Sequence, residues 1–481
     1  MIKVCFIGSE YAIVKRLAPY LKTSDIQFVL MAKTKADFRL YKKEGFETYP
    51  TWEVFEKEKT FSEQELLDLD LKYGPYGIKA ICNSDIFMPY LYKKREDQIQ
   101  LIARAYKFWE NFFNNHKIDF VMIIAHSGLF DARTAYNVSR ARGNPIFLRF
   151  TFSPRLKDYF ALCDVGEEHY WSELNDVLTE GPKLLSEEQR KFTLAFIDKR
   201  LGDSNQNVKI NFTSASLFNR FKYLTWLWKE VILARFKNEP FEAAAQRCAI
   251  HKLIKRSWWN YITKNFMRYD KVENERYVYF PIYSENEIMN LALYHYWTQN
   301  QLSLIEEVAA SLPSGIKLYV KEHPNTPGQF PLLRLKEVQK IPNVKIIHPS
   351  IKVKEILDNC EALINLHGTT GWEAFLARKP VVMLAPWIYS AKSRLIYRVD
   401  SPCELPVTIF KAIKEGSSVY NNNENEWLWF IHSVITTCAK GEYPGGTCLP
   451  FDCDGEEENV MQVAKSISEK IYRKLISKKN D

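Results

Sequence analysis

The residue types best suited to hold a phosphate group are concentrated between Asn365 and Glu373, which read Asn-Leu-His-Gly-Thr-Thr-Gly-Trp-Glu. The stretch joins an apolar segment predicted as a strand, 362–365, to a predicted helix. The first N–H groups of a helix lack partners and lie at the positive end of its dipole, so they attract anions. Because glycine lets the backbone approach a ligand closely, the loop is expected to bind a nucleotide phosphate.

Each residue of this loop has an expected role in binding. The phosphate contacts are assigned to His367, Gly368, Thr369, Thr370 and Gly371. Glu373 lies just inside the predicted helix, where its carboxylate can accept hydrogen bonds from the two hydroxyls of a ribose. The alternative is a capped helix in which Glu373 is merely favourable near the dipole.

A second set of candidate residues, Lys321-Glu-His-Pro324, follows the apolar segment 316–320. Lysine and histidine together can neutralise a phosphate leaving group. Pro324 fixes the turn and holds His323 at the end of the predicted strand. The alternative, a surface turn, is less favoured because a predicted phosphate loop follows about one strand–helix unit later. Lys321, His323 and Pro324 are therefore expected at the same ligand site.

Two regions of alternating strands and helices are expected to position these residues. In open parallel sheets, ligands bind beyond the carboxyl ends of the strands. The sequence therefore predicts an α/β protein with two doubly wound, Rossmann-like domains facing a cleft. A full G-x-G-x-x-G is missing after the first strand, so no dinucleotide site is assigned. The predicted strands are 2–8, 26–31, 118–124, 146–152, 277–280, 316–320, 344–347, 362–365 and 380–384.

The chain is long enough for several domains, with 481 residues. We expect an N-terminal Rossmann-like domain at 1–204 and a helical linker at 205–270. A second Rossmann-like domain at 271–415, with the expected phosphate loop, and C-terminal helices at 416–481 complete the predicted division.

Aromatic and basic residues are interleaved in the linker, at 218–236 and 252–271, and the tail 463–479 is amphipathic and basic. Such segments either lie at a membrane interface or pack their aromatic side chains into the core. The first interpretation predicts peripheral contact with the inner face of the plasma membrane.

Composition narrows the class of protein further. The formal net charge of +8 favours anionic partners, but no dense Lys/Arg block or nucleic-acid motif accompanies it, so no nucleic acid is expected. The nine cysteines show no zinc-ligand spacing and are expected as reduced thiols. The start of the chain lacks the features of a signal peptide, so a cytoplasmic protein is expected.

Four sequence blocks together are similar to the capsular polysaccharide biosynthesis family, which includes Kdo transferases of bacterial capsule assembly. They are 277–283, 318–324, 365–373 and 379–382, and the similarity is good over about 275–390 and looser over the first 200 residues. The resemblance implies a GT-B-like glycosyltransferase that builds a surface polysaccharide, often from a CMP-linked acidic sugar. It also implies that His323 contacts the donor phosphate, that the Thr369-Thr370-Gly371 loop holds the nucleotide, and that Glu373 binds the ribose.

The catalytic base has several candidates, because a transfer with inversion needs a group that deprotonates the acceptor hydroxyl. His126, Asp131 and Glu287 are preferred, and Asp85, Asp164 and Glu285 are the alternatives. Each of them also has an ordinary interpretation as a solvated or capping residue.

No metal and no cofactor is expected, only a nucleotide-sugar as substrate. The two Asp-x-Asp triplets, 68–70 and 452–454, fall in a helical pattern and in a polar loop, not at a strand end where Mg²⁺ would bridge a diphosphate. The expected partners are the donor and a glycan or lipid-linked acceptor. Three alternatives remain: a nucleotide-sugar epimerase, a polyol-phosphate transferase using CDP-glycerol, and a non-catalytic assembly subunit.

Overall fold

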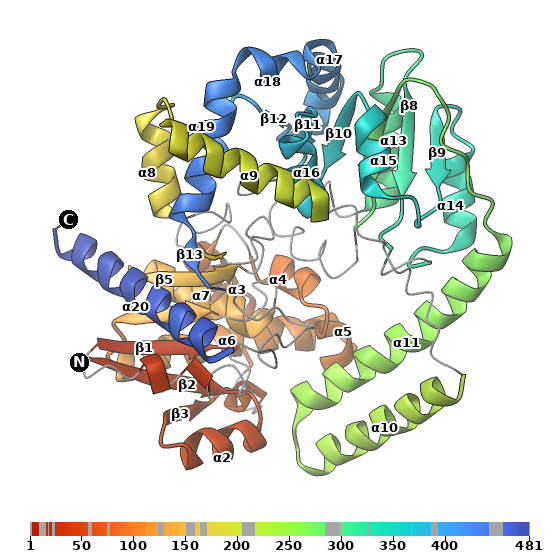
Figure 1. Ribbon diagram of the computed structural model, residues 1–481. Coiled ribbons are helices and arrows are strands. Elements are labelled where there is room, and N and C mark those ends of the chain that lie inside the picture. Colours follow the sequence, from red (N-terminus) through yellow and green to blue (C-terminus); the bar gives the residue numbers. More distant parts are fainter. Residues whose placement is uncertain are drawn as a thin grey trace. The chain divides into compact units, whose positions relative to one another are not determined.

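The computed structural model contains two parallel-rich sheets with helices around them (Figure 1). Among the predicted site residues, His126, Asp164, Glu285, Glu287 and His367 lie outside the described part of the chain. The structure describes residues 2–8, 16–17, 19–21, 25–55, 60–74, 77–123, 129–150, 159–163, 171–203, 217–283, 298, 300–324, 328–366, 368–385, 393–441 and 456–480.

The first sheet has seven strands in the order β13-β6-β5-β4-β1-β2-β3. Neighbouring strands from β3 to β5 are parallel, whereas β6 runs antiparallel to both β5 and β13. The chain builds outward from β1 in one direction to β3 and then returns to the other side of β1 with β4, which is the doubly wound pattern. The strands are β1 (Ile2–Ile7), β2 (Ile26–Ala32), β3 (Glu47–Pro50), β4 (Phe120–Ile123), β5 (Ile146–Phe150), β6 (Tyr159–Cys163) and β13 (Ala439–Lys440).

The core of this sheet forms because almost every residue of its central strands is apolar. Val4 and Phe6 of β1 pack with Phe28 of β2 and Phe120 of β4. The long C-terminal helix α20 (Glu456–Asn480) contributes to the same cluster through residues such as Ile467. The end of the chain is therefore part of the core around the first strands.

The helices of the first region lie on the sheet or beside it. Helix α3 begins at a capping box between Ser62 and Glu65. Asp68 and Asp70 both lie within α3, as the helical pattern predicted. The helices between residues 35 and 141 are α2 (Lys35–Lys43), η1 (Trp52–Phe55), α3 (Glu63–Tyr73), α4 (Ile78–Ser84), α5 (Met88–Leu91), α6 (Arg95–Asn115) and α7 (Phe130–Ala141).

The second sheet has six strands in the order β12-β11-β10-β7-β8-β9, and every paired neighbour is parallel. Here too the order reverses, because β8 and β9 extend to one side of β7 and β10 to β12 extend to the other. The two Rossmann-like sheets predicted from the sequence are confirmed. The strands are β7 (Tyr277–Pro281), β8 (Lys317–Lys321), β9 (Val344–Ile347), β10 (Ala362–Asn365), β11 (Val381–Met383) and β12 (Tyr397–Arg398).

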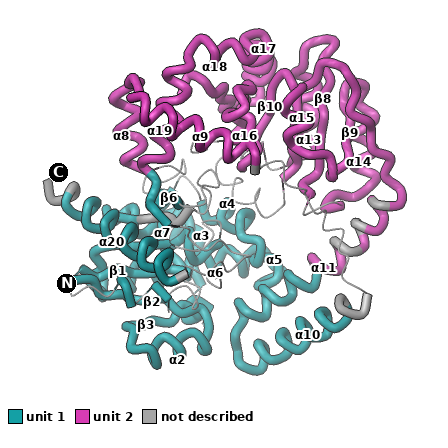
Figure 2. The backbone as a smooth tube through the Cα atoms, in the orientation of Figure 1, with its two compact units in different colours: residues 1–166, 217–251, 438–481 teal, residues 167–216, 252–437 magenta. Residues whose placement is uncertain are grey.

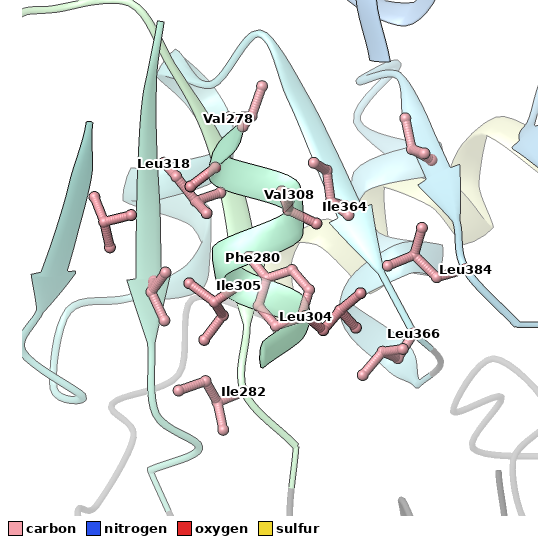
Figure 3. Packing of buried hydrophobic residues seen from close by; sticks show 14 of the residues in the cluster. Val278, Phe280, Ile282, Leu304, Ile305, Val308, Leu318, Ile364, Leu366 and Leu384 are labelled. Atoms are coloured by element: carbon pink, nitrogen blue, oxygen red, sulfur yellow. The ribbon is translucent and has the colours of Figure 1, made fainter. Parts of the chain in front are cut away.

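Helix α13 (Gln301–Ala310) covers the centre of this sheet (Figure 3). Its Leu304, Ile305 and Val308 pack against Val278 and Ile364 of the two central strands. The strands themselves are buried along their length, as expected of parallel strands covered on both faces. The remaining helices are α14 (Leu332–Gln339), α15 (Val353–Asn359), α16 (Thr369–Leu376), η4 (Pro402–Glu404), α17 (Leu405–Glu415), α18 (Ser418–Asn422) and α19 (Glu424–Thr437).

The chain forms two compact units that are not continuous in sequence (Figure 2). Unit 1 contains residues 1–166, 217–251 and 438–481, and unit 2 contains 167–216 and 252–437. This differs from the predicted division into four consecutive segments: the described residues 171–203 pack with helices α16 and α19 of unit 2, and α20 packs with the first sheet. The connecting helices are α8 (Ser172–Glu180), α9 (Glu187–Asp203), α10 (Leu217–Phe236) and α11 (Pro240–Phe266).

Within the described residues, no helix has both the length and the apolar character needed to cross a membrane.

Candidate functional site

The strand order of unit 2 reverses between β7 and β10, and the site residues collect at the carboxyl ends of these strands. Tyr283 lies just beyond β7, and Asn365 is the last residue of β10. The buried Tyr283 hydroxyl donates a hydrogen bond to Oδ1 of Asn365. In open parallel sheets such a reversal creates the crevice in which ligands bind. This hydrogen bond therefore lies at the position in unit 2 where a ligand is expected.

Gly368 precedes helix α16 and has φ of 97°, a conformation that side-chain-bearing residues rarely adopt. A Cβ at this position would lie 3.0 Å from Cε1 of Tyr283. Both the positive φ and the close approach of the Tyr283 ring therefore favour glycine at position 368. The consequence is that the chain turns tightly from β10 into α16, with no side chain over the first turn of the helix.

The N-terminal turn of α16 contains three of the predicted phosphate contacts. Thr369 and Thr370 are half-buried, whereas Gly371 is buried. Gly368, the residue before α16, has no side chain that could cap the helix. A helix start of this kind offers backbone N–H groups and two hydroxyls to an anion.

Glu373 is buried in α16 and forms an ion pair with Arg200 at the end of α9. The Arg200 Nη2 to Glu373 Oε1 distance is 3.0 Å, and the two side chains are only 7% and 9% exposed. Such a pair is costly to break, because either charge left alone would remain in a poorly hydrated place. The ion pair fixes the Glu373 carboxylate and joins the segment before residue 204 to the second sheet.

Lys321 ends strand β8 and is almost completely buried, with 2% exposure. Its Nζ donates a hydrogen bond of 3.4 Å to the Pro349 carbonyl. Burial lowers the pKa of Lys321 to about 8, and the Glu373 carboxylate partly opposes this shift. Burial and the Lys321 charge together lower the pKa of His348, which follows β9. An anion bound nearby would favour the charged form of Lys321.

Next to Lys321, the carboxyl of Glu322 is fully buried, whereas His323 and Pro324 are half-buried. Oε1 of Glu322 accepts a hydrogen bond of 3.1 Å from the Gly328 N–H, and Oε2 has no partner among the described residues. Burial raises the pKa of Glu322 to about 7, against the effect of hydrogen bonds from the Gly328 and Gln329 backbone. The Glu322 carboxyl thereby holds the backbone of residues 328–329 close to the end of β8. His323 lies in the turn that follows this strand end.

The carboxyl edge of the first sheet has its own charged residues. Lys33 follows β2, and its Nζ lies 2.8 Å from Oδ2 of Asp131, at the start of α7. Asp85 is fully buried and accepts hydrogen bonds from the N–H groups of Phe87 and Phe130. Burial raises the pKa of Asp85 to about 6. A small pocket here is lined by Lys33, Thr51, Val54, Phe55, Phe108, Trp109, Phe130, Asp131 and Phe241.

The predicted site residues therefore divide into three groups. Lys321, His323, Pro324 and the loop from Gly368 to Glu373 all lie at the carboxyl edge of unit 2. Asp131 and Asp85 lie in unit 1. His126, Glu287 and His367 fall outside the described residues, so their roles stay predictions.

Sequence reasoning missed Arg200 as a partner of Glu373, as well as the pairing of Lys33 with Asp131. Arg200 is 173 positions from Glu373, and the only local signal is a basic residue in the last turn of a helical segment.

Comparison with protein families gives one match: residues 198–392 match the model described as capsule polysaccharide biosynthesis protein. No curated protein matches the chain.

Among solved structures, a beta Kdo 2,7 transferase, KpsC of Thermosulfurimonas dismutans, is 12% identical. The match covers 86% of this chain and 90% of that one, with a TM-score of 0.34. A glycosyltransferase from Rickettsia africae is 8% identical over 98% of both chains, with a TM-score of 0.28. The UDP-GlcNAc 2-epimerase of Methanocaldococcus jannaschii, in complex with UDP-GlcNAc and UDP, is 12% identical over 87% and 94%, with a TM-score of 0.28.

The matched segment contains Arg200, Lys321, His323 and the loop from Gly368 to Glu373, and the resemblance to the capsule polysaccharide biosynthesis family is therefore confirmed over residues 198–392.

Proposed function

We propose that the protein is a glycosyltransferase that moves a sugar from a nucleotide-sugar donor to a surface or capsular polysaccharide acceptor. One observation carries the proposal. The carboxyl edge of the second sheet combines the start of α16 with Lys321, His323 and the Arg200–Glu373 pair, inside the segment that matches the capsule family. This combination of charge and helix-start N–H groups suits a nucleotide phosphate.

In this proposal the start of α16 and Lys321 stabilise the phosphate that leaves when the sugar is transferred. Negative charge grows on the phosphate oxygens as the bond to the sugar carbon breaks. Donors fixed in advance around those oxygens lower the energy of this transition state without rearrangement. Lys321, whose pKa burial has lowered to about 8, gains protonation as the anion binds. His323 contacts the same phosphate. Pro324 restricts the backbone of the turn that contains His323.

Glu373 binds the ribose of the donor nucleotide, and Arg200 positions it. The 3.0 Å ion pair orients the carboxylate, and an ionised carboxylate is a strong acceptor for hydroxyl groups. The donor that fits the family resemblance is a CMP-linked acidic sugar.

Acceptor activation is assigned first to Asp131 of unit 1, the preferred candidate for the base among the described residues. Its carboxylate lies at the carboxyl edge of the sheet, next to an aromatic-lined pocket that suits a sugar ring. Lys33 keeps this carboxylate in place through the 2.8 Å ion pair. His126 and Glu287 are the further candidates for this step.

The transfer is proposed to need no metal. The described Asp-x-Asp triplet, 68–70, lies within helix α3 and not at a strand end where Mg²⁺ would bridge a diphosphate. A chelator should therefore leave sugar transfer unchanged, whereas a complete loss that Mg²⁺ restores would contradict this part of the proposal.

As part of the same proposal the enzyme works in the cytoplasm, where nucleotide-sugars are available, and reaches a glycan or lipid-linked acceptor through peripheral contact with the inner face of the plasma membrane.

Calorimetric titration with CMP, CDP, UDP, GDP and ADP tests the donor site. We expect selective binding of one nucleotide and a loss of at least tenfold in affinity in His323→Ala. His251→Ala is the matched control, because this exposed histidine belongs to unit 1 and bonds Tyr90. Selective binding of CMP supports a CMP-linked acidic sugar as the donor. Selective binding of UDP or GDP would keep the proposed transferase and replace this donor with a sugar linked to the nucleotide that binds. A folded protein that binds none of the five contradicts the donor site itself.

A further inference from the structure

Helix α10 carries a row of exposed apolar side chains along one face. Phe221, Trp228, Ile232 and Phe236 are 66%, 50%, 51% and 86% exposed. Their spacing of seven, four and four residues places them on one stripe of the helix. Single exposed apolar residues are ordinary on protein surfaces, but a contiguous row indicates an interaction site.

The opposite face of α10 already packs against the protein. Leu227, Val231 and Ala234 are 1%, 2% and 3% exposed. A surface helix normally has one apolar face toward the core and polar residues outside. On α10 the outer face is apolar too, so folding of the chain does not account for the stripe of Phe221, Trp228, Ile232 and Phe236, hereafter the α10 stripe.

Basic residues flank the α10 stripe, and they outnumber acidic residues in the segment of α10 and α11. Lys222, Lys229 and Arg235 lie beside it on the exposed part of α10. From 217 to 266 the sequence holds ten Lys and Arg and three Asp and Glu, a net +7 of the +8 for the whole chain. The excess of positive over negative charge is therefore concentrated in the segment of these two helices.

Helix α11 repeats the pattern in its second half. Ile254, Trp258 and Tyr261 are 52%, 61% and 63% exposed, and their spacing of four and three residues again places them on one stripe. Residues 243–266 contain no Asp or Glu at all.

We propose that the α10 stripe docks on an anionic lipid surface. Trp and Tyr favour the headgroup level of a bilayer, and Phe and Ile favour the acyl boundary below it. Each Lys or Arg near an anionic leaflet contributes about 1 kcal/mol. The inference rests on the proposed function in one respect only, namely that the acceptor lies at the membrane; the docking surface itself is independent of the donor site.

Charge decides between lipid and the other occupants of an apolar helix face. A second copy of this chain would bring the same net +7 segment against itself, and like charges oppose such pairing. An anionic bilayer complements both the apolar stripe and its basic flanks.

Flotation of the full-length protein with vesicles tests the docking surface. We expect binding to phosphatidylcholine vesicles that contain phosphatidylglycerol, and at least tenfold weaker binding to vesicles of phosphatidylcholine alone. Trp228→Ser with Ile232→Ser should weaken binding at least tenfold, because the half-exposed side chains no longer enter the bilayer. Lys222→Glu with Lys229→Glu should weaken it about 25-fold or more, at about 1 kcal/mol for each cation lost.

The matched control replaces Val407 and Phe410 of α17 by serine, two residues that are 74% and 56% exposed elsewhere on the surface. This variant should bind vesicles as the wild type does. All variants should keep their nucleotide affinity, which separates failure of this proposal from failure of the donor site.

Three results would overturn the proposal: no binding to anionic vesicles, equal loss in the α17 control, or binding that the α10 substitutions leave unchanged. Self-association in sedimentation velocity that the serine variant of α10 abolishes would also overturn it, in favour of a second copy of the chain.

Discussion

The two sheets share one winding pattern but differ in the charges that they place at their carboxyl edges. In unit 1 the edge presents a cation and a carboxylate already paired, Lys33 and Asp131, beside an aromatic pocket. In unit 2 the edge presents Lys321 and Glu322, two buried groups whose pKa values burial moves to about 8 and about 7. It also presents the start of helix α16, which follows a glycine. The same topology thus provides an edge that is suited to an anion and an edge that is suited to a neutral, ring-shaped ligand.

Removing Arg200 should have the largest effect on stability, because it breaks the buried ion pair with Glu373 in unit 2. Arg200→Ala leaves the Glu373 carboxylate buried without its cation, so the free energy of unfolding should fall by about 3–5 kcal/mol. Urea unfolding followed by circular dichroism measures this.

The matched control is Arg276→Ala, which breaks the exposed pair with Glu361 in the same unit. It should cost less than about 1 kcal/mol. Equal losses in the two variants would show that the Arg200–Glu373 pair has no special place in the site.

Asp131→Asn tests the edge of unit 1. If Asp131 is the base, sugar transfer should slow roughly 100-fold or more while nucleotide affinity stays as in the wild type. Initial rates with saturating donor, together with calorimetry, measure the two quantities.

Asp37→Asn serves as the control for this substitution, because Asp37 bonds only Thr34 at the start of α2 among the described residues. Unchanged turnover in Asp131→Asn would assign the base to another residue, and lost nucleotide affinity would place the donor at the edge of unit 1.

Gly368→Ala should have an intermediate effect on stability and a strong effect on nucleotide binding. The added methyl meets Cε1 of Tyr283 at 3.0 Å, and φ of 97° is unfavourable for alanine. We expect a loss of about 2–3 kcal/mol in unfolding free energy and at least tenfold in affinity.

Gly315→Ala isolates the backbone part of this cost, since Gly315 also has a positive φ, of 83°, but a Cβ there would meet nothing within 4 Å. Its expected cost is about 1 kcal/mol with nucleotide affinity intact. If Gly368→Ala behaves in the same way, the contact with Tyr283 does not shape the site.

Glu322→Gln should change the pH dependence of stability more than stability itself. The pKa of Glu322 in the folded protein is raised from 4.5 to about 7, so the folded state binds the proton more tightly than the unfolded chain does. The contribution of the Glu322 carboxyl to the free energy of unfolding is fully present below about pH 4.5. It is lost as pH rises toward 7.

The glutamine side chain of this variant does not titrate, so the variant should lack a fall of roughly 1–3 kcal/mol between pH 5 and 7.5. Thermal unfolding across this range measures it, with Glu337→Gln at an exposed pair of α14 as the control. A pH slope identical to that of the wild type would mean that Glu322 is not the titrating group.

The sequence carried strong signals for the strands and for the loop of unit 2, because both are local. A run such as 277–280 is apolar throughout and ends at Pro281, which predicts a buried parallel strand. The change from strand to glycine-rich loop to helix at 365–371 is readable in the same way. Where such a strand ends, the carboxyl edge follows from the topology, so Lys321 and Glu373 could be assigned to one site.

Long-range pairings left no such signal. Arg200 reaches Glu373 from a distant helix, and β13 pairs with β6 across more than half of the chain. Nothing local distinguishes Arg200 from other basic residues at helix ends, since its role depends on how α9 packs against α16. The division into compact units is hidden for the same reason, because α20 packs against the first sheet through residues such as Ile467, which lie far from β1 in the sequence.

Amide hydrogen exchange with and without the selected nucleotide tests the difference between the two edges most directly, because it reports on both in one experiment. The account predicts slower exchange in peptides that contain 321–324 and 368–373, with no change in peptides that contain Lys33, Thr51 or Asp131. Protection at the edge of unit 1, with none at the start of α16, would contradict it.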